Sequence, residues 1–257
     1  MAKPQEKDLP VTIEIMKVQH QVLGFCLLGT SPLVCNPMSA KARQDLLFPP
    51  KKKNRHERET SLKHDPLAEY RRSAYLSKDA TSPTLVLALS ASFKRAMASA
   101  ALELPGTNKT QIGRLSWVLD DYVPIFGVQQ LWMTTVRSAD IKRTPDVRTR
   151  AILPQWATKI QVGFVTPQLN KQAVSNLLSA AGVFIGVGDG RPEKGALSYG
   201  RFKIVDPDDP QYMAVVASGT RDAQAKAFEQ PTYYDTETEE LLEWYLAETR
   251  RRGFTAA

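Results

Sequence analysis

The sequence is poor in the residues on which disulfide-rich and metal-binding proteins depend, and it has no long apolar run. Its 257 residues include two cysteines, Cys26 and Cys35, too few for a disulfide framework and without the spacing of a zinc site. No apolar stretch approaches the roughly 20 residues that span a bilayer, and residues 1–8 lack the apolar core of a signal peptide. We therefore expect a cytoplasmic protein with reduced thiols and no contact with a membrane.

The motifs of several common enzyme classes are also missing. There is no Walker loop, no HExxH motif and no GxSxG motif. Two aspartate clusters, residues 120–121 and 206–209, lie beside prolines and do not have the spacing of an EF-hand. The three histidines, His20, His56 and His64, fall on one face of a predicted strand or in a charged, surface-exposed segment. We expect no catalytic residue, no metal and no cofactor.

Positive charge is in excess. The chain has 34 lysines and arginines against 27 aspartates and glutamates, a formal net charge of +7 and an isoelectric point near 9.4. Such a balance favours an anionic partner, nucleic acid first, although a basic protein without such a partner has the same composition.

A glycine-rich basic stretch, residues 186–195, indicates where an anion could bind. Four of its ten residues are glycine, and Arg191 and Lys194 stand among them. Glycines let the backbone turn sharply and approach a ligand closely. A strand at 199–205, which carries Arg201, follows directly, so the stretch does not fit the dinucleotide motif GxGxxG, which leads into a helix. The alternative is a glycine-rich hairpin without a ligand.

The spacing of apolar residues predicts an α+β fold of the ferredoxin-like, or RRM-like, type. The expected elements are strand 18–28, helix 90–103, strand 130–138, strand 159–166, helix 171–182, a short apolar strand 183–187, and strand 199–205. Apart from the short strand, this is the order β-α-β-β-α-β. Both helices are expected on one face of an antiparallel sheet, which leaves the other face uncovered, as in RNA-recognition modules that bind single strands there.

We expect three regions. They are a polar tail at 1–17, a domain at 18–205 and an extension at 206–257 with a helix at 237–252. The domain carries two excursions. One is a basic insertion at 29–89, which includes Lys51, Lys52 and Lys53, and the other is a protruding thumb-like segment at 139–156.

Cations cluster in two further places. Lys94 and Arg95 lie in the first turn of the predicted helix, beside exposed amide groups that suit a phosphate. Arg143, Arg148 and Arg150 give the thumb-like segment its charge. Solvated surface cations are the alternative for both groups. The aromatic residues Tyr70, Trp132, Tyr199 and Phe202 are candidates for stacking on bases, although Phe202 is expected to face the core.

Three segments in this order and spacing resemble the RAMP superfamily of CRISPR systems. They are the end of the first strand (Thr30-Ser31-Pro32-Leu33), the helix start (Leu87 to Arg95), and the glycine-rich loop from Gly186 to Gly195 with Gly200-Arg201-Phe202. Within the superfamily, the chain is most similar to backbone subunits that polymerise along CRISPR RNA, or to a mobile-element relative of them. The resemblance covers roughly 18–205; the region after 206 has no counterpart in it.

The resemblance implies a protein that clamps the backbone of a guide RNA without reading its sequence. The implied partners are the guide RNA, a complementary DNA or RNA target, copies of the same chain in a helical filament, and other effector subunits. The implied RNA-binding residues are Lys94, Arg95, Arg143, Arg148, Arg150, Gly188, Gly190, Arg191, Lys194 and Arg201, with Lys51, Lys52 and Lys53 in the insertion.

Two other functions stay open. Some RAMP proteins process CRISPR RNA with a histidine as acid or base, and His20, His56 or His64 could take that role. Some backbone subunits cut their target with an aspartate after the first strand, but residues 29–40 contain no carboxylate. The third candidate is a structural protein of a phage or mobile element.

Overall fold

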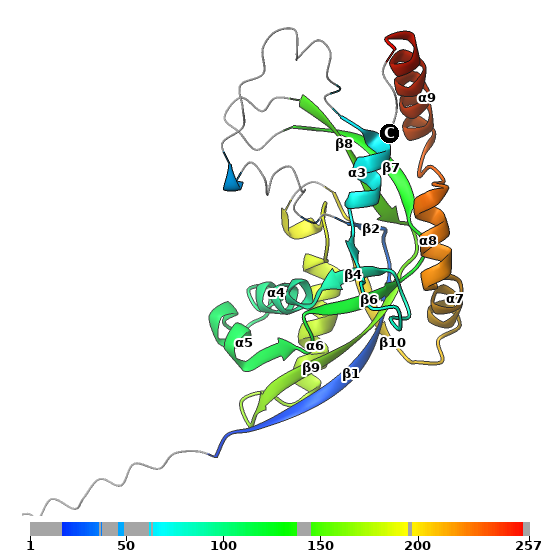
Figure 1. The fold of residues 1–257 in the computed structure, drawn as a ribbon. Helices are drawn as coiled ribbons and strands as arrows, with labels where there is room; N and C mark the ends of the chain where they lie inside the picture. The colour runs from blue at the N-terminus through cyan, green and yellow to red at the C-terminus, as the bar shows by residue number, and fades with distance from the viewer. Residues whose placement is uncertain are drawn as a thin grey trace, which may run out of the picture.

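The computed structural model describes residues 17–35, 37, 46–48, 62, 64–137, 145–194 and 197–253 (Figure 1). They form a mixed α+β fold with two antiparallel sheets. The strands are β1 (Gln19–Gly29), β2 (Leu33–Val34), β3 (Tyr75–Leu76), β4 (Val86–Leu89), β5 (Ser116–Val118), β6 (Tyr122–Phe126), β7 (Gln130–Arg137), β8 (Pro145–Leu153), β9 (Ala157–Thr166) and β10 (Phe202–Val205). The helices are α3 (Pro66–Arg72), α4 (Ser90–Ala100), α5 (Lys109–Leu115), α6 (Lys171–Ala180), α7 (Pro210–Ser218), α8 (Arg221–Glu229) and α9 (Thr236–Arg251).

The larger sheet has the strand order β10-β1-β9-β6-β4-β3, and β5 also pairs with β9. Its centre is the long pairing of β1 with β9, in which Leu23 lies opposite Val162 and Phe25 opposite Ile160. Alternate residues of these strands point to opposite faces, so the four residues named here share one face. That face holds the main hydrophobic core.

Helices α4 and α6 cover this core face. Phe93 of α4 packs against Phe202 of β10 with ring centroids 5.9 Å apart. Asn170 begins α6 by accepting a hydrogen bond from the backbone amide of Ala173, as an N-cap asparagine does. Strand 18–28 and the helices beginning at 90 and 171 are therefore confirmed, within one or two residues at most ends.

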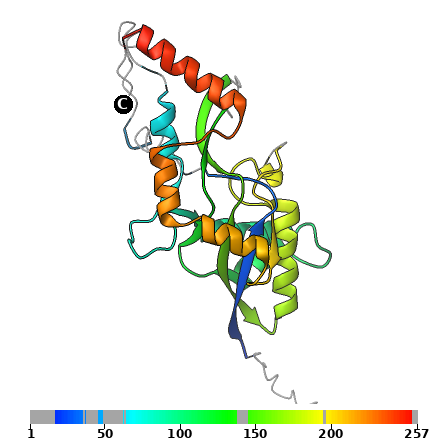
Figure 2. The same cartoon turned by 90° about the vertical axis from the view of Figure 1, so that its right-hand side faces the viewer.

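The opposite face is not wholly uncovered, contrary to the sequence prediction. Tyr212 and Val215 of α7 pack on Cys26 and Leu28, which lie in the C-terminal half of β1. In Figure 1, α7 lies on the right of the sheet and α4 on the left, and Figure 2 views the molecule from the side of α7. The segment 206–209, which is rich in aspartate and contains a proline, therefore leads into a helix that covers part of this face of the sheet.

The smaller sheet, β2-β8-β7, corrects two predictions. Strand 130–138 exists as β7, but it pairs with β8 in the smaller sheet, and the short strands β5 and β6 lie beside β9 in the larger sheet instead. The sequence predicts that the thumb-like segment 139–156 is a polar hairpin or loop; β8 does form a hairpin with β7, but the second half of the segment is not polar, because β8 ends in the fully buried run Ala151–Leu153. Helices α3 and α9 pack against this sheet.

The remaining differences lie near the C-terminus. The predicted strand 183–187 is instead a helical turn of π type, Ala181–Ile185, and the following strand begins at Phe202 rather than at 199. The helix predicted at 237–252 is confirmed as α9, and α7 and α8 precede it. None of the helices that the structure describes could span a membrane by length and apolarity.

Candidate nucleic-acid interface

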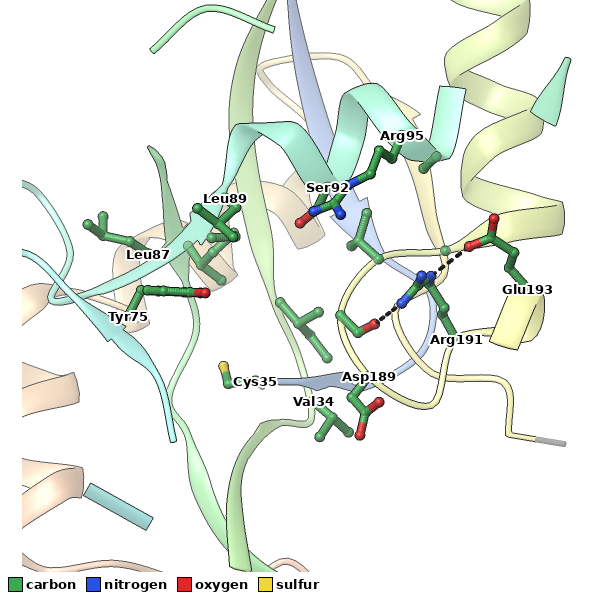
Figure 3. Close-up of a pocket in the computed structure, with 17 residues that line it drawn as sticks. Val34, Cys35, Tyr75, Leu87, Leu89, Ser92, Arg95, Asp189, Arg191 and Glu193 are labelled. Atoms are coloured by element: carbon green, nitrogen blue, oxygen red, sulfur yellow. Dashed lines mark hydrogen bonds and ion pairs between the residues drawn. The ribbon is translucent and has the colours of Figure 1, made fainter. Parts of the chain in front are cut away.

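A pocket of about 300 Å³ lies where β2, the first turns of α4 and the glycine-rich loop meet (Figure 3). Arg95 and Arg191 lie at one end of it, and Tyr75 and Leu87 at the other. The remaining wall is made by Leu33, Val34, Cys35, Ala88, Leu89, Ser92, Ala96, Ile125, Gly186, Val187, Gly188, Asp189 and Glu193. The pocket therefore joins three segments that are far apart in sequence, each of which the sequence analysis singled out.

The loop holds its shape through glycines with positive φ. Gly186, Gly188, Gly190 and Gly200 have φ between 65° and 80°, a region that other residues avoid. A Cβ at Gly188 would lie 2.7 Å from the carbonyl oxygen of Val34, so the loop also passes too close to β2 for a side chain. Glycine is thus required at Gly188 by conformation and by space.

Two arginines give the pocket its positive end. Arg95 is exposed and its Nε donates to the carbonyl of Ala91, 3.1 Å away on the same helix. Arg191 is half-buried, and its Nη1 donates to the carbonyl of Gly188 at 2.9 Å. Lys94, next to Arg95, is half-buried and does not line the pocket. Of the two helix cations predicted to bind, Arg95 therefore has the more direct access.

Glu193 restrains Arg191. Its carboxylate accepts hydrogen bonds from Arg191 Nε at 3.0 Å and from the hydroxyl of Ser99 at 2.7 Å. Partial burial opposes ionisation of Glu193, but these hydrogen bonds and the nearby charges of Arg191 and Lys109 outweigh it, and its pKa lies below the ordinary value. The carboxylate thus stays charged and links the loop to α4.

This link should make the loop sensitive to acid. Because the folded pKa of Glu193 lies below its ordinary 4.5, its contribution to stability is present above that pH and is lost as the pH falls through the folded value. We expect wild-type protein to melt about 2 °C above Glu193→Gln near pH 6, and the difference to disappear as the pH falls below the folded pKa of Glu193. Thermal unfolding followed by circular dichroism measures it. A difference that is independent of pH would contradict the prediction, and all other carboxylates are common to both proteins.

Arg150 has a different place from the one the sequence suggested. It is 8% exposed and forms an ion pair with Asp189 in the glycine-rich loop. Burial, together with the charge of Arg148, lowers its pKa to about 10, so it remains protonated at neutral pH. Its charge is therefore neutralised inside the protein by Asp189, and this ion pair holds the glycine-rich loop against β8. Arg148, two residues earlier, is exposed.

The aromatic candidates are mostly enclosed. Trp132 is buried and meets Tyr199 and Tyr234 edge-on, at ring-centroid distances of 5.6 and 6.1 Å. Phe202 and Tyr70 are fully buried in the core, as expected for Phe202. Only Tyr199 of these four is partly open to solvent, which leaves it as the one candidate that could stack on a base.

The other predicted residues fall into two groups. Lys194 is exposed at the end of a short 3₁₀ turn, and Arg201 is half-buried with its backbone amide bonded to the hydroxyl of Ser31 at 2.9 Å. The buried Nε of Arg201 has no hydrogen-bond partner among the described residues. The residues outside the described parts of the chain are Lys51, Lys52, Lys53, Arg143 and His56.

The histidines do not form an evident catalytic group. His64 lies between two carboxylates, Glu69 at 2.8 Å and Asp146 at 3.0 Å. His20 lies on the larger sheet, with its ring centroid 6.3 Å from that of Trp117. Within the described ranges, no group of three or more histidine, cysteine, aspartate or glutamate side chains could hold a metal ion.

Sequence reasoning missed Tyr75, Ser92 and Glu193. Ser92 lies between the helix start and Arg95 in the segment already marked as functional, so its position in the first turn of the helix could have identified it. Glu193 likewise lies inside the marked glycine-rich stretch 186–195, whereas Tyr75 carried no such signal. No known protein family matches this chain, and no curated protein is similar to it.

Proposed function

We propose that the protein is an RNA-binding backbone subunit of a CRISPR-type effector complex, and that it holds a guide RNA by its phosphates. The observation that carries the proposal is the meeting of Arg95 and Arg191 with the positive-φ glycine loop around one pocket. The arginines offer charge-assisted donors, which favour phosphate oxygens, and the glycines let a ligand approach the loop backbone closely. Neither group reads a base edge, so the binding would be largely independent of sequence.

The topology supports the same proposal. The neighbours β10, β1, β9 and β6 correspond in order to the fourth, first, third and second strands of a ferredoxin-like sheet, with α4 and α6 as its two helices. The hairpin β7–β8 is inserted between β6 and β9, where the resemblance implies a thumb. Residues between β1 and α4 supply the insertion.

Contact with RNA is tested by removing the two pocket arginines. We expect Arg95→Ala and Arg191→Ala each to weaken binding of single-stranded RNA about tenfold, and to reduce the slope of log affinity against log salt by about 1. Lys226→Ala is the matched control, because Lys226 is an exposed cation on α8, outside the pocket. Fluorescence anisotropy with a labelled RNA measures both quantities. Equal effects of all three variants would argue against a site at the pocket.

Polymerisation is the second part of the proposal. Copies of the chain would associate head to tail on the guide, which produces an open helix rather than a closed ring. Protein purified without nuclease should then carry RNA of discrete length in a large assembly, visible in the ratio of absorbance at 260 and 280 nm and in the size of the extracted RNA. A nucleic-acid-free monomer that also fails to bind added RNA would favour a scaffold protein instead.

We also expect that the protein does not cleave the RNA that it binds. Both ring nitrogens of His64 face carboxylates of the same chain, so the ring has no nitrogen free to exchange a proton with a substrate. We expect His64→Ala to leave the length of bound RNA unchanged. RNA that is shortened by the wild-type chain and left intact by His20→Ala, His56→Ala or His64→Ala would favour the endoribonuclease alternative.

A further inference from the structure

On the face of the larger sheet opposite the main core, the part that α7 does not cover forms an exposed surface. It is formed by His20, Val22 and Gly24 of β1, Gln161 of β9 and Trp117 of β5. Val22 is 45% exposed, and Gln161 opposite Gly24 is also exposed. This surface lies on the other side of the sheet from α4, α6 and the main core.

Gly24 is the feature that the protein's own packing does not explain. Its φ is not positive, and a Cβ built on it would meet nothing within 4 Å. Two other strand glycines have an internal reason, because the indole of Trp117 covers Gly163 and the indole of Trp156 covers Gly29. A glycine inside a strand weakens that strand, and where no side chain fills its place it often marks the close approach of a ligand or another backbone.

The chemistry around Gly24 fits an anionic, aromatic ligand. Trp117 and His20 are adjacent rings at one side, and Lys159, exposed on β9 opposite Cys26, lies at the other. The strands β1, β5, β9 and β10 contain no aspartate or glutamate, and the exposed Asp120 follows β5 by two residues. A pair of rings beside a lysine, on strands that carry no carboxylate, is a combination by which single strands are bound through stacking and phosphate contacts.

We propose that this surface is a second binding site for single-stranded nucleic acid, separate from the pocket of Arg95 and Arg191. A base stacks on Trp117 where the indole is open to solvent, the sugar-phosphate backbone passes over Gly24, and Lys159 neutralises a phosphate. The site goes beyond the proposed function, because it lies on the opposite face of the sheet and needs neither the glycine-rich loop nor the hairpin.

The first test maps contacts on the wild-type chain. A single-stranded oligonucleotide of about 12 nucleotides, substituted with 5-iodouracil, is photocrosslinked to the full chain, and the crosslinked peptides are identified by mass spectrometry. We expect a crosslink in residues 17–24 or 116–118. Crosslinks confined to 90–100 and 186–203 would overturn this inference and leave the pocket site standing. Crosslinks confined to residues 17–24 or 116–118 would support this inference and overturn the pocket as a binding site. No crosslink at all would overturn both sites.

The second test blocks the surface. Gly24→Glu places a carboxylate over the centre of the site, and the open space around Gly24 lets the side chain fit without a clash. We expect affinity for the same oligonucleotide to fall about tenfold, while Trp244→Ala, which removes an exposed tryptophan on α9, has no effect. Unchanged affinity in a folded Gly24→Glu protein would overturn the inference. A change in self-association without a change in affinity would also overturn it, and would indicate that a second copy of the chain occupies this surface.

Discussion

Replacing Gln224 with alanine is expected to lower the free energy of unfolding by about 4 kcal/mol or more and the melting temperature by about 10 °C. The side chain of Gln224 is fully buried, and its amide makes four hydrogen bonds to backbone groups, each 2.8 Å long. Its oxygen accepts from the amides of Leu85 and Val86, and its nitrogen donates to the carbonyls of Ile125 and Gly127. Alanine would leave these four groups without this partner, three of them buried and the amide of Leu85 partly buried.

The matched control for Gln224→Ala is Lys226→Ala. Lys226 lies two residues later on α8 and is exposed, so its replacement removes a charge without removing a buried contact. We expect a change within about 0.5 kcal/mol there. Denaturant unfolding of both variants gives the comparison. A loss below about 1 kcal/mol in Gln224→Ala would mean that water enters and satisfies the four groups.

Gly200→Ala is expected to disrupt the glycine-rich loop and to cost at least about 4 kcal/mol. Gly200 is buried with φ of 70°, and a Cβ there would overlap the carbonyl oxygen of Val187. The positive φ alone costs an alanine about 1–2 kcal/mol. The overlap must in addition push Val187 away and break the hydrogen bond from its amide to the carbonyl of Gly200, which is 2.9 Å long.

Gly106→Ala separates these two effects. Gly106 has almost the same φ, 73°, but a Cβ there meets nothing within 4 Å. We expect a loss of about 1–2 kcal/mol in Gly106→Ala and retained RNA binding, against loss of both stability and binding in Gly200→Ala. Unfolding curves and fluorescence anisotropy with labelled RNA, measured for both variants, distinguish the two effects. Equal losses in the two variants would show that conformation rather than space governs Gly200.

Regular amphipathic elements were predictable from the sequence. Strand β1 places Leu23, Phe25 and Leu27 on one face, α6 has an asparagine cap, and α9 repeats its apolar residues with helical spacing, so local pattern and final structure agree for these elements. The sheet to which β7 belongs was not predictable, because alternation identifies a strand but not its partners. The strands that replaced it, β5 and β6, are three and five residues long, and β5 is too short to show a period.

The candidate site was predictable in its segments but not in its pairings. Glycine content marked the loop and adjacent cations marked the start of α4, and both line the pocket. The sequence could not show that Asp189 neutralises Arg150, since the two residues are 39 positions apart and are brought together by tertiary contacts such as the bridge of Val34 with Asp189. Nor could it show Gln224, because a single glutamine on a helix carries no pattern that distinguishes a buried position from an exposed one.

The arrangement of the C-terminal helices also determines which contacts can form while the chain is still being synthesised. By residue 205 the ribosome has delivered every strand of the larger sheet. The β7–β8 hairpin and helix α3 still lack some of their contacts, because Leu131 bonds to Thr232 and Tyr234, Met133 bonds to Thr238, and Tyr70 of α3 bonds to Ala227. A nascent chain therefore exposes the apolar underside of the hairpin until its last helices emerge, and this is the interval in which chaperones or an early partner have most to protect.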